Sequence, residues 1–196
     1  MYDASTSQKF NATSKTVAFS GGATGQKYQG SSLDTYLNTT FFATLSATMQ
    51  AAIVTKIINQ DMWKYSSSAP SSGTYYHITH GSSNLYYFDT QNGIAYGTAE
   101  VGSRNVYALS IKDVIDYLGV SAGGDFADTD IYQMFWNRST SISGDIWLRS
   151  ALHNGNTNAF CADGYTGLLN DYYYTESFRA RPAFQIDLSK IAYTKN

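Results

Sequence analysis

The chain is poor in cysteine, in charge and in long apolar runs, and each shortage excludes a class of protein. It has one cysteine in 196 residues, Cys161, so no internal disulfide and no cysteine-based zinc site is expected. Charged residues make up 14% of the chain, the formal net charge is -2, and Lys and Arg are not clustered. Binding to nucleic acid is therefore not predicted, because neutralising phosphates needs clustered cations. No apolar run of about 18 residues and no signal peptide is recognisable, so membrane insertion is not predicted either.

Tyrosine and small polar residues are abundant where charge is scarce. The chain has 17 Tyr and 16 Gly, and much of the remainder is Ser, Thr and Asn. This is the composition of antibody binding loops, in which rigid amphipathic rings meet small, adaptable polar groups. A chain of this length is expected to form one domain with a sizeable core. The composition therefore favours a ligand-binding domain.

Periodicity predicts helices early and strands late. Apolar residues recur at three- and four-residue steps from Leu33 to Ile58, which predicts one long or two consecutive amphipathic helices. Ser110 with Asp113 three residues on, and Gly119 as a stop, predict a helix between them. Short strands are predicted at residues 16–19, 75–79, 85–88, 106–109, 146–148 and 183–188.

The order of these elements predicts an α+β fold with short strands, two or more helices and long irregular loops, because there is no regular alternation of strand and helix. Residues 1–30 are polar and Gly-rich and are set apart as an N-terminal lead-in segment. Residues 31–196 are expected to form the ligand-binding domain. The stretch 150–177 is expected to be a long loop, and loops of that length in a compact domain are usually functional.

Motifs for catalysis and metal binding are weak. His77 and His80 are three residues apart, but the flanking Tyr75 and Ile78 favour a strand, in which the two imidazoles point to opposite faces. A Ser/His/Asp hydrolase around His153 would lack the G-x-S-x-G elbow. We predict no catalytic residue, no metal and no cofactor.

The stretch from residue 150 to 175 differs from the rest of the chain because it contains no Lys, Glu, Gln, Met or Trp. One interpretation is a plain polar loop. The other is a recognition surface with aromatic anchors and amide or carboxylate hydrogen-bonding groups. The candidate ligand-binding residues are Leu152, His153, Asn154, Asn156, Asn158, Phe160, Asp163, Tyr165, Leu168, Asn170, Tyr172, Tyr173 and Tyr174.

Four blocks of the sequence resemble, in the same order, a bacterial and phage domain family similar in fold to the C-type lectins and the formylglycine-generating enzymes. They are residues 32–42, 106–114, 147–150 and 179–188. The last two also resemble the borders of the variable region in target proteins of diversity-generating retroelements. Such systems copy a template with errors at adenines, and Asn codons altered in this way do not reach Lys, Glu, Gln, Met or Trp. These are the five residue types missing from 150–175.

The resemblance implies a C-type lectin-like fold with a variable region at about 150–177, held by the scaffold residues Trp147, Arg149, Arg181 and Pro182. It further implies an extracellular protein, on a phage particle or bacterial cell surface, that binds protein or glycan ligands on a target cell. A homo-oligomer is compatible with this. Any signal or anchor is expected to lie outside this sequence.

The resemblance also has limits. The Glu-Pro-Asn or Gln-Pro-Asp motif of calcium-dependent lectins is absent, so calcium-mediated sugar binding is not implied. The paired cysteines of formylglycine-generating enzymes are absent as well. Two alternatives stay open: an enzyme of that fold with altered chemistry around His153, Asp163 or Cys161, and a structural decoration domain of a fibre or capsid.

Overall fold

The computed structural model describes residues 6–20, 22–67, 74–79, 84–91, 94–95, 97–119, 125–127, 144–164 and 168–191. The strands are β1 (Ser7–Lys9), β2 (Thr16–Ala18), β3 (Thr24–Gln26), β4 (Ile53–Val54), β5 (Lys56–Ser66), β6 (Thr74–Thr79), β7 (Asn84–Gln91), β8 (Ile94–Ala95), β9 (Thr98–Arg104), β10 (Tyr107–Ala108), β11 (Asp125–Ala127), β12 (Ile146–Leu152), β13 (Asn158–Asp163), β14 (Leu168–Tyr173), β15 (Ser177–Ala180), β16 (Pro182–Ala183) and β17 (Gln185–Ile186). The helices are α1 (Ser32–Tyr36), the π-helix η1 (Leu37–Phe41), α2 (Phe42–Thr44), α3 (Ala47–Ala52), α4 (Ile111–Leu118) and the 3-10 helix η2 (Leu188–Lys190).

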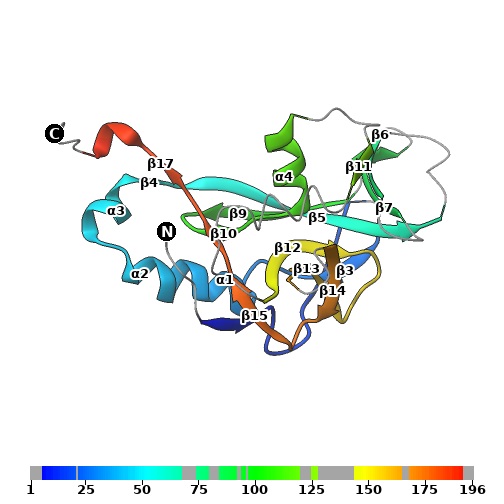
Figure 1. The fold of residues 1–196 in the computed structure, drawn as a ribbon, viewed down its shortest axis with the longest axis horizontal. Helices are drawn as coiled ribbons and strands as arrows, with labels where there is room; N and C mark the ends of the chain where they lie inside the picture. The colour runs from blue at the N-terminus through cyan, green and yellow to red at the C-terminus, as the bar shows by residue number, and fades with distance from the viewer. Residues whose placement is uncertain are drawn as a thin grey trace.

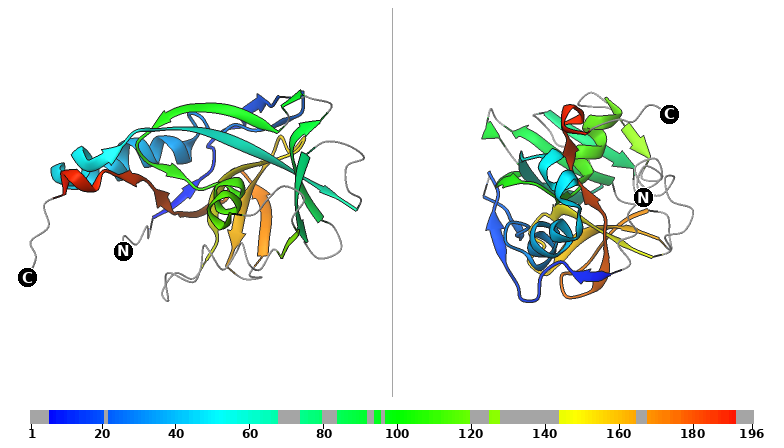
Figure 2. Two further views of the ribbon diagram at one scale, coloured as in Figure 1. Left: turned by 90° about the horizontal axis from the view of Figure 1, so that it is seen from above. Right: turned by 90° about the vertical axis from the view of Figure 1, so that its left-hand side faces the viewer.

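A large mixed sheet with a few short helices beside it confirms the predicted α+β class (Figure 1). The sheet order is β1-β15-β12-β5-β7-β6-β11, and long strand β5 crosses the molecule. Helices α1 to α3 and η2 gather at one end, while β6, β7 and β11 lie at the other (Figure 2). Strand β12 is central: it runs parallel to β15 at its start and parallel to β5 at its end, and it pairs with β13 on its other edge.

The early helical region ends sooner than the sequence predicts. Helix α1 begins after Ser31, whose hydroxyl accepts a hydrogen bond from the Asp34 backbone N–H, and the helical chain continues through η1 and α2. Helix α3 stops at Ala52, where the chain becomes extended, and β5 starts at Lys56. The prediction of helix up to Ile58 is therefore wrong, because the β-branched residues there pair with β9 in the sheet.

Helix α4 forms as the sequence predicts. The Ser110 side chain accepts a hydrogen bond from the Asp113 N–H, and the Asp113 carboxylate accepts one from the Ser110 N–H. Gly119 ends the helix in the left-handed conformation, with φ 70°, which Gly adopts without the steric cost that a Cβ would add. The capping-box prediction is confirmed.

The stretch 150–177 is mostly strand, so the prediction of a long loop is wrong. After β12 and a turn, β13 and β14 form an antiparallel hairpin in register from Asn158↔Tyr173 to Asp163↔Leu168. The sequence does not predict β13 as a strand because both faces of β13 are buried. Ala159 and Cys161 belong to one core cluster, and Phe160 and Ala162 belong to the other. A strand buried on both faces has no alternation of apolar and polar residues. The strand expected at 183–188 is likewise broken into β16, β17 and η2.

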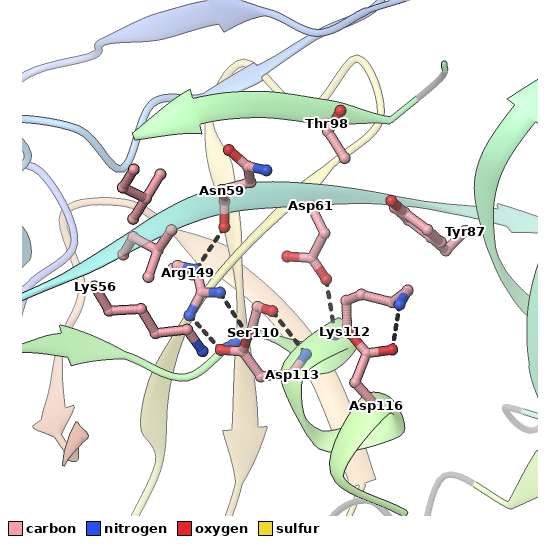
Figure 3. Close-up of a pocket in the computed structure, with 12 residues that line it drawn as sticks. Lys56, Asn59, Asp61, Tyr87, Thr98, Ser110, Lys112, Asp113, Asp116 and Arg149 are labelled. Carbon is pink, nitrogen blue, oxygen red and sulfur yellow. Dashed lines mark hydrogen bonds and ion pairs between the residues drawn. The ribbon is translucent and has the colours of Figure 1, made fainter. Parts of the chain in front are cut away.

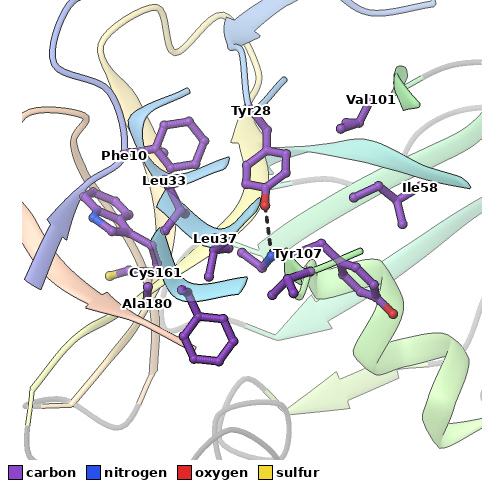
Figure 4. Close-up of a cluster of buried hydrophobic side chains, with 14 of the residues drawn as sticks. Phe10, Tyr28, Leu33, Leu37, Ile58, Val101, Tyr107, Cys161 and Ala180 are labelled. Atoms are coloured by element: carbon purple, nitrogen blue, oxygen red, sulfur yellow. Dashed lines mark hydrogen bonds between the residues drawn. The ribbon is translucent and has the colours of Figure 1, made fainter. Parts of the chain in front are cut away.

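The first core cluster reaches into the N-terminal segment (Figure 4). Phe10 packs edge-on against Trp147, with ring centroids 5.7 Å apart, and the Trp147 Nε1–H donates to the Gln8 carbonyl at 2.8 Å. The buried Tyr28 hydroxyl accepts from the Ala108 N–H at 3.0 Å. Residues that we set apart as a lead-in segment thus supply the same core as the rest of the chain.

The second core cluster lies under α4. It joins Val114 and Ile115 of the helix to Trp63 of β5, Leu148 of β12 and Phe160 of β13. All five side chains are buried. Strand β12 therefore contributes to both clusters. We call β12, together with the part of β13 that pairs with Ile146 and Trp147, the base of the β13–β14 hairpin.

Candidate functional site

The candidate residues predicted from the sequence separate into a buried group and an exposed group. Phe160 is fully buried and packs against Tyr65, with ring centroids 5.9 Å apart. The prediction that Phe160 anchors a ligand is therefore wrong, because its side chain completes the core under α4. Leu152 is half-buried against the same cluster, Leu168 is half-buried, and Tyr165 lies outside the described residues.

Several polar side chains lie together on the face of the hairpin opposite Phe160. Asp163 is 2% exposed and accepts hydrogen bonds from the Tyr172 hydroxyl and the Asn170 side-chain amide, both at 3.3 Å. Burial, and next the carboxylate of Asp163, raise the pKa of nearby Asp145, although the Gly164 N–H partly offsets this. These contacts make Asp163 and Asn170 internal partners of one another rather than free ligand-binding groups.

Cys161 is not placed for nucleophilic chemistry. Its side chain is fully buried, and burial, followed by the carboxylates of Asp145 and Asp163, raises the pKa of the thiol. The thiolate, which is the reactive form of cysteine, is therefore strongly disfavoured at neutral pH.

The exposed candidates gather at the opposite end of the hairpin, which we call the hairpin end and define as residues 153–158 and 173–177. The Tyr174 N–H donates to the Thr157 carbonyl at 2.9 Å, so the two segments are tied together. Tyr173 is 56% exposed, and Asn154 and Asn156 are exposed. Asn154 has a positive φ of 54°, which Asn tolerates better than most residues.

The hairpin end rests on the N-terminal β2–β3 hairpin. The Thr24 hydroxyl donates to the Asn156 side-chain carbonyl at 2.9 Å, and the Gln26 side-chain amide donates to the Asn156 backbone carbonyl. The Ser14 hydroxyl donates to the same carbonyl at 3.3 Å. Residues 12–16, which are exposed, therefore adjoin the hairpin end.

The remaining candidates at the hairpin end, and Tyr172 next to it, are only partly accessible. Tyr172 packs edge-on against Phe178, with ring centroids 5.1 Å apart, and Tyr174 packs against the first core cluster. The Asn158 amide donates to the Asp171 carboxylate at 2.7 Å. His153 is half-buried, and burial, followed by the charge of Lys64, lowers its pKa. Of the three consecutive tyrosines, Tyr173 is the exposed one.

The scaffold residues named from the resemblance are buried or half-buried. Arg149 is 3% exposed: its Nε–H donates to the Asn59 carbonyl and one Nη1–H to the Ala108 carbonyl, each at 2.7 Å, and the guanidinium forms an ion pair with Asp113. Pro182 is in β16, which pairs with β10, and Arg181 is half-buried. Burial lowers the pKa of Arg181.

A pocket of about 300 Å³ lies beside Arg149, between β5, β9 and the start of α4 (Figure 3). Asp61 faces it and accepts hydrogen bonds from the Ser150 hydroxyl at 2.8 Å and from the Lys112 backbone N–H at 2.9 Å. The Trp63 Nε1–H also donates to Asp61, at 2.7 Å. Burial raises the pKa of Asp61, and Arg149 is the largest influence that lowers it.

The pocket is lined by Asp61, Asp113 and Arg149, which are therefore already bonded within the protein. The hydrogen bonds of Asp61 and the Arg149–Asp113 ion pair join β5, β12 and α4, and we call this group the brace. This group could not be predicted from the sequence because its members come from three separate parts of the chain. The capping box at residues 110–113 and the block at 147–150 were visible signals of two of those parts.

Within the described ranges, no group of three or more His, Cys, Asp and Glu is placed to hold a metal ion. His77 stacks on Tyr86 with ring centroids 4.9 Å apart, and His80 lies outside these ranges. No helix in the same part of the chain is long and apolar enough to cross a membrane.

A known protein family matches most of the chain. The family described as Domain of unknown function (DUF6273) matches residues 13–188. The chain belongs to the DUF6273 family. The match includes both the N-terminal β2–β3 hairpin and the β13–β14 hairpin, so the contact between them lies within this DUF6273 domain. No curated protein and no solved structure matches the chain.

Proposed function

We propose that this DUF6273 domain is a non-enzymatic ligand-recognition module with a C-type lectin-like fold, whose hairpin end is diversified by a retroelement. The observation on which this rests is the absence of Lys, Glu, Gln, Met and Trp from residues 150–175. These five types are the ones that adenine-directed change of Asn codons does not produce.

The geometry of the hairpin end supports binding rather than catalysis. Tyr173, Asn154 and Asn156 place an aromatic ring and two amides at one exposed surface. Aromatic anchors ringed by small polar groups are typical of recognition surfaces, and a tyrosine at the centre of an interface can account for about 2 kcal/mol or more of binding free energy.

The base of the hairpin supports the proposal in a second way. Trp147 and Arg149 before the stretch, and Ala180 after it, are buried. Binding residues are held in position best when they extend from rigid strands. We therefore assign ligand contact to the hairpin end alone and not to the whole stretch 150–177.

The ligand class follows from the same proposal. An exposed surface of tyrosine and amides suits a protein or glycan ligand on a target cell. Since such a ligand would lie on a target cell, we also propose that the domain acts outside the cell, on a phage particle or a bacterial surface.

Sequencing of this gene across a population of its source organism tests the proposal. We expect substitutions at exposed positions of the hairpin end, above all Asn154, Asn156 and Tyr173. Buried positions in the same stretch, Phe160 and Leu169, should be spared because a polar replacement there would be costly.

Tyr117 on α4 is the matched control. It is 71% exposed, more than Tyr173, but lies outside the stretch. If Tyr117 varies as much as Tyr173, variation merely follows exposure, and the diversification proposal is wrong. An invariant hairpin end would overturn it equally.

A further inference from the structure

A second hollow, of about 340 Å³, lies between β1 and the α1–η1 helical segment, away from the brace around Arg149. Strand β1 and helix α1 are in contact, and Figure 1 shows them next to each other. Gln8 of β1 forms one wall and residues of α1 and η1 form the other, with Lys15 at the side. All of these residues lie outside the stretch 150–175.

The lining of this hollow is rich in hydroxyl groups. Six of its nine residues have one, namely Ser31, Ser32, Thr35, Tyr36, Thr39 and Thr40. The described residues that line it include no carboxylate and no aliphatic side chain. A hydroxyl both donates and accepts hydrogen bonds, so this lining is complementary to a ligand whose own polar groups are hydroxyls.

Several of these polar groups are available for a ligand. The Thr39 hydroxyl is used internally, since it donates to the Thr35 carbonyl at 2.7 Å. By contrast, the side chains of Gln8, Thr35, Tyr36 and Thr40 make no hydrogen bond in the part of the chain that the structure describes. Thr35 and Thr40 are exposed, and Tyr36 is half-buried with its ring against the first core cluster.

The charge of the hollow argues against other ligand classes. Lys15 is its one cation among the described lining residues, and its ammonium group already donates to the Gly30 carbonyl at 2.7 Å. A cation would find no carboxylate, and an apolar ligand would find no aliphatic surface. The volume is at the small end of ligand sites, which span about 300–1,000 Å³.

We infer that the hollow between β1 and α1 binds a neutral sugar unit. The hydroxyls of Thr35 and Thr40 and the amide of Gln8 would hydrogen-bond the sugar hydroxyls. Tyr36 would add a hydrogen bond through its own hydroxyl, and its ring offers a flat apolar surface to the C–H face of the sugar ring. The site does not depend on retroelement diversification, because none of its residues lies in the variable stretch.

The test is a titration of the full chain, labelled with nitrogen-15, with the methyl glycosides of glucose, galactose, mannose and N-acetylglucosamine. For at least one of them, we expect saturable shifts at the backbone amides of residues 31–40 and at the Gln8 side-chain amide. The double variant Thr35→Val/Tyr36→Phe removes two hydroxyls and keeps the shape of both side chains. We expect it to weaken binding about tenfold, as the loss of two modest hydrogen bonds should.

The matched control is Thr13→Val/Tyr117→Phe, which removes the same two groups from residues outside the lining of the hollow and should bind as tightly as the original chain. Equal weakening by both double variants, shifts elsewhere in the chain, or no shift with any glycoside would overturn the inference. Inorganic phosphate is the competing probe. If it alone produces the shifts and Lys15→Met abolishes them, the hollow is an anion site and the inference is wrong.

Discussion

The two ends of the β13–β14 hairpin are built from different interactions. At its base, Trp147 and Arg149 of the neighbouring strand β12 are 1% and 3% exposed, and each donates hydrogen bonds to backbone carbonyls of distant segments. At the hairpin end, Tyr173 is 56% exposed, and the two segments there are tied by a backbone hydrogen bond. The base is part of the interior, whereas the hairpin end is a surface that is held by hydrogen bonds from Ser14, Thr24 and Gln26.

This difference shows where the stretch 150–177 can change without loss of folding. Removing a buried group leaves a cavity or an unpaired polar partner, and either costs several kcal/mol. Exchanging an exposed side chain usually alters stability by less than about 0.5 kcal/mol. A domain whose ligand-contacting residues vary would need its buried and its exposed positions to be separated in this way within one hairpin.

The largest expected effect is at the base. Trp147→Ala should lower the free energy of unfolding by about 3–5 kcal/mol, because it removes a fully packed aromatic side chain. Chemical denaturation measures this. Trp147→Phe, which keeps a ring against Phe10 but loses the hydrogen bond to Gln8, should cost clearly less. A loss below about 1 kcal/mol for Trp147→Ala would show that the base is not the rigid support described above.

An effect of intermediate size is expected on the free energy of unfolding, and it should differ between the adjacent residues Tyr172 and Tyr173. Tyr172→Ala should lower the free energy of unfolding by about 1–2 kcal/mol, because it removes the ring packed on Phe178 and the hydrogen bond to Asp163. Tyr173→Ala should change it by less than about 0.5 kcal/mol. Both variants can be compared by urea denaturation under the same conditions. Equal losses would erase the distinction between core-facing and exposed positions on β14.

The smallest expected effect is a pH dependence at His153, on the border between the two regions. Burial lowers its pKa below the ordinary value near 6.5, so the folded state binds fewer protons than the unfolded state as the pH falls through that range. The contribution of His153 to stability is therefore present above pH 6.5 and lost towards acid. We expect the urea midpoint to fall from pH 7.5 to 5.5, and to fall less in His153→Gln. An identical fall in both proteins would contradict this assignment.

Local signals in the sequence were reliable where local interactions decide the structure. The α4 capping box and its Gly119 stop depend on neighbours within one helix, and both were predictable. The helix before β5 was predicted too long because pairing with β9, far along the chain, decides the conformation of residues 56–58. The α+β class followed from element order, but the sheet order did not.

The composition of the candidate site could be read from the sequence, but the burial of its side chains could not. The missing residue types marked the stretch 150–175, and the exposed Asn154, Asn156 and Tyr173 lie in it. The burial of Phe160 and Asp163 could not be read from the sequence, because β13 is covered on both faces by segments distant in sequence. The brace around Asp61 was likewise missed, since its ion pair and hydrogen bonds join three separate parts of the chain.

The α+β class, the α4 helix, the single cysteine and the unusual composition of residues 150–175 can all be recognised without the folded structure. These properties depend on composition or on contacts between near neighbours. Which side chains of that stretch are interior and which are exposed becomes evident from the folded structure alone. The reason is that burial depends on which other segments cover a side chain: β12 and two core clusters enclose the base of the hairpin, while its far end contacts β3 and remains exposed.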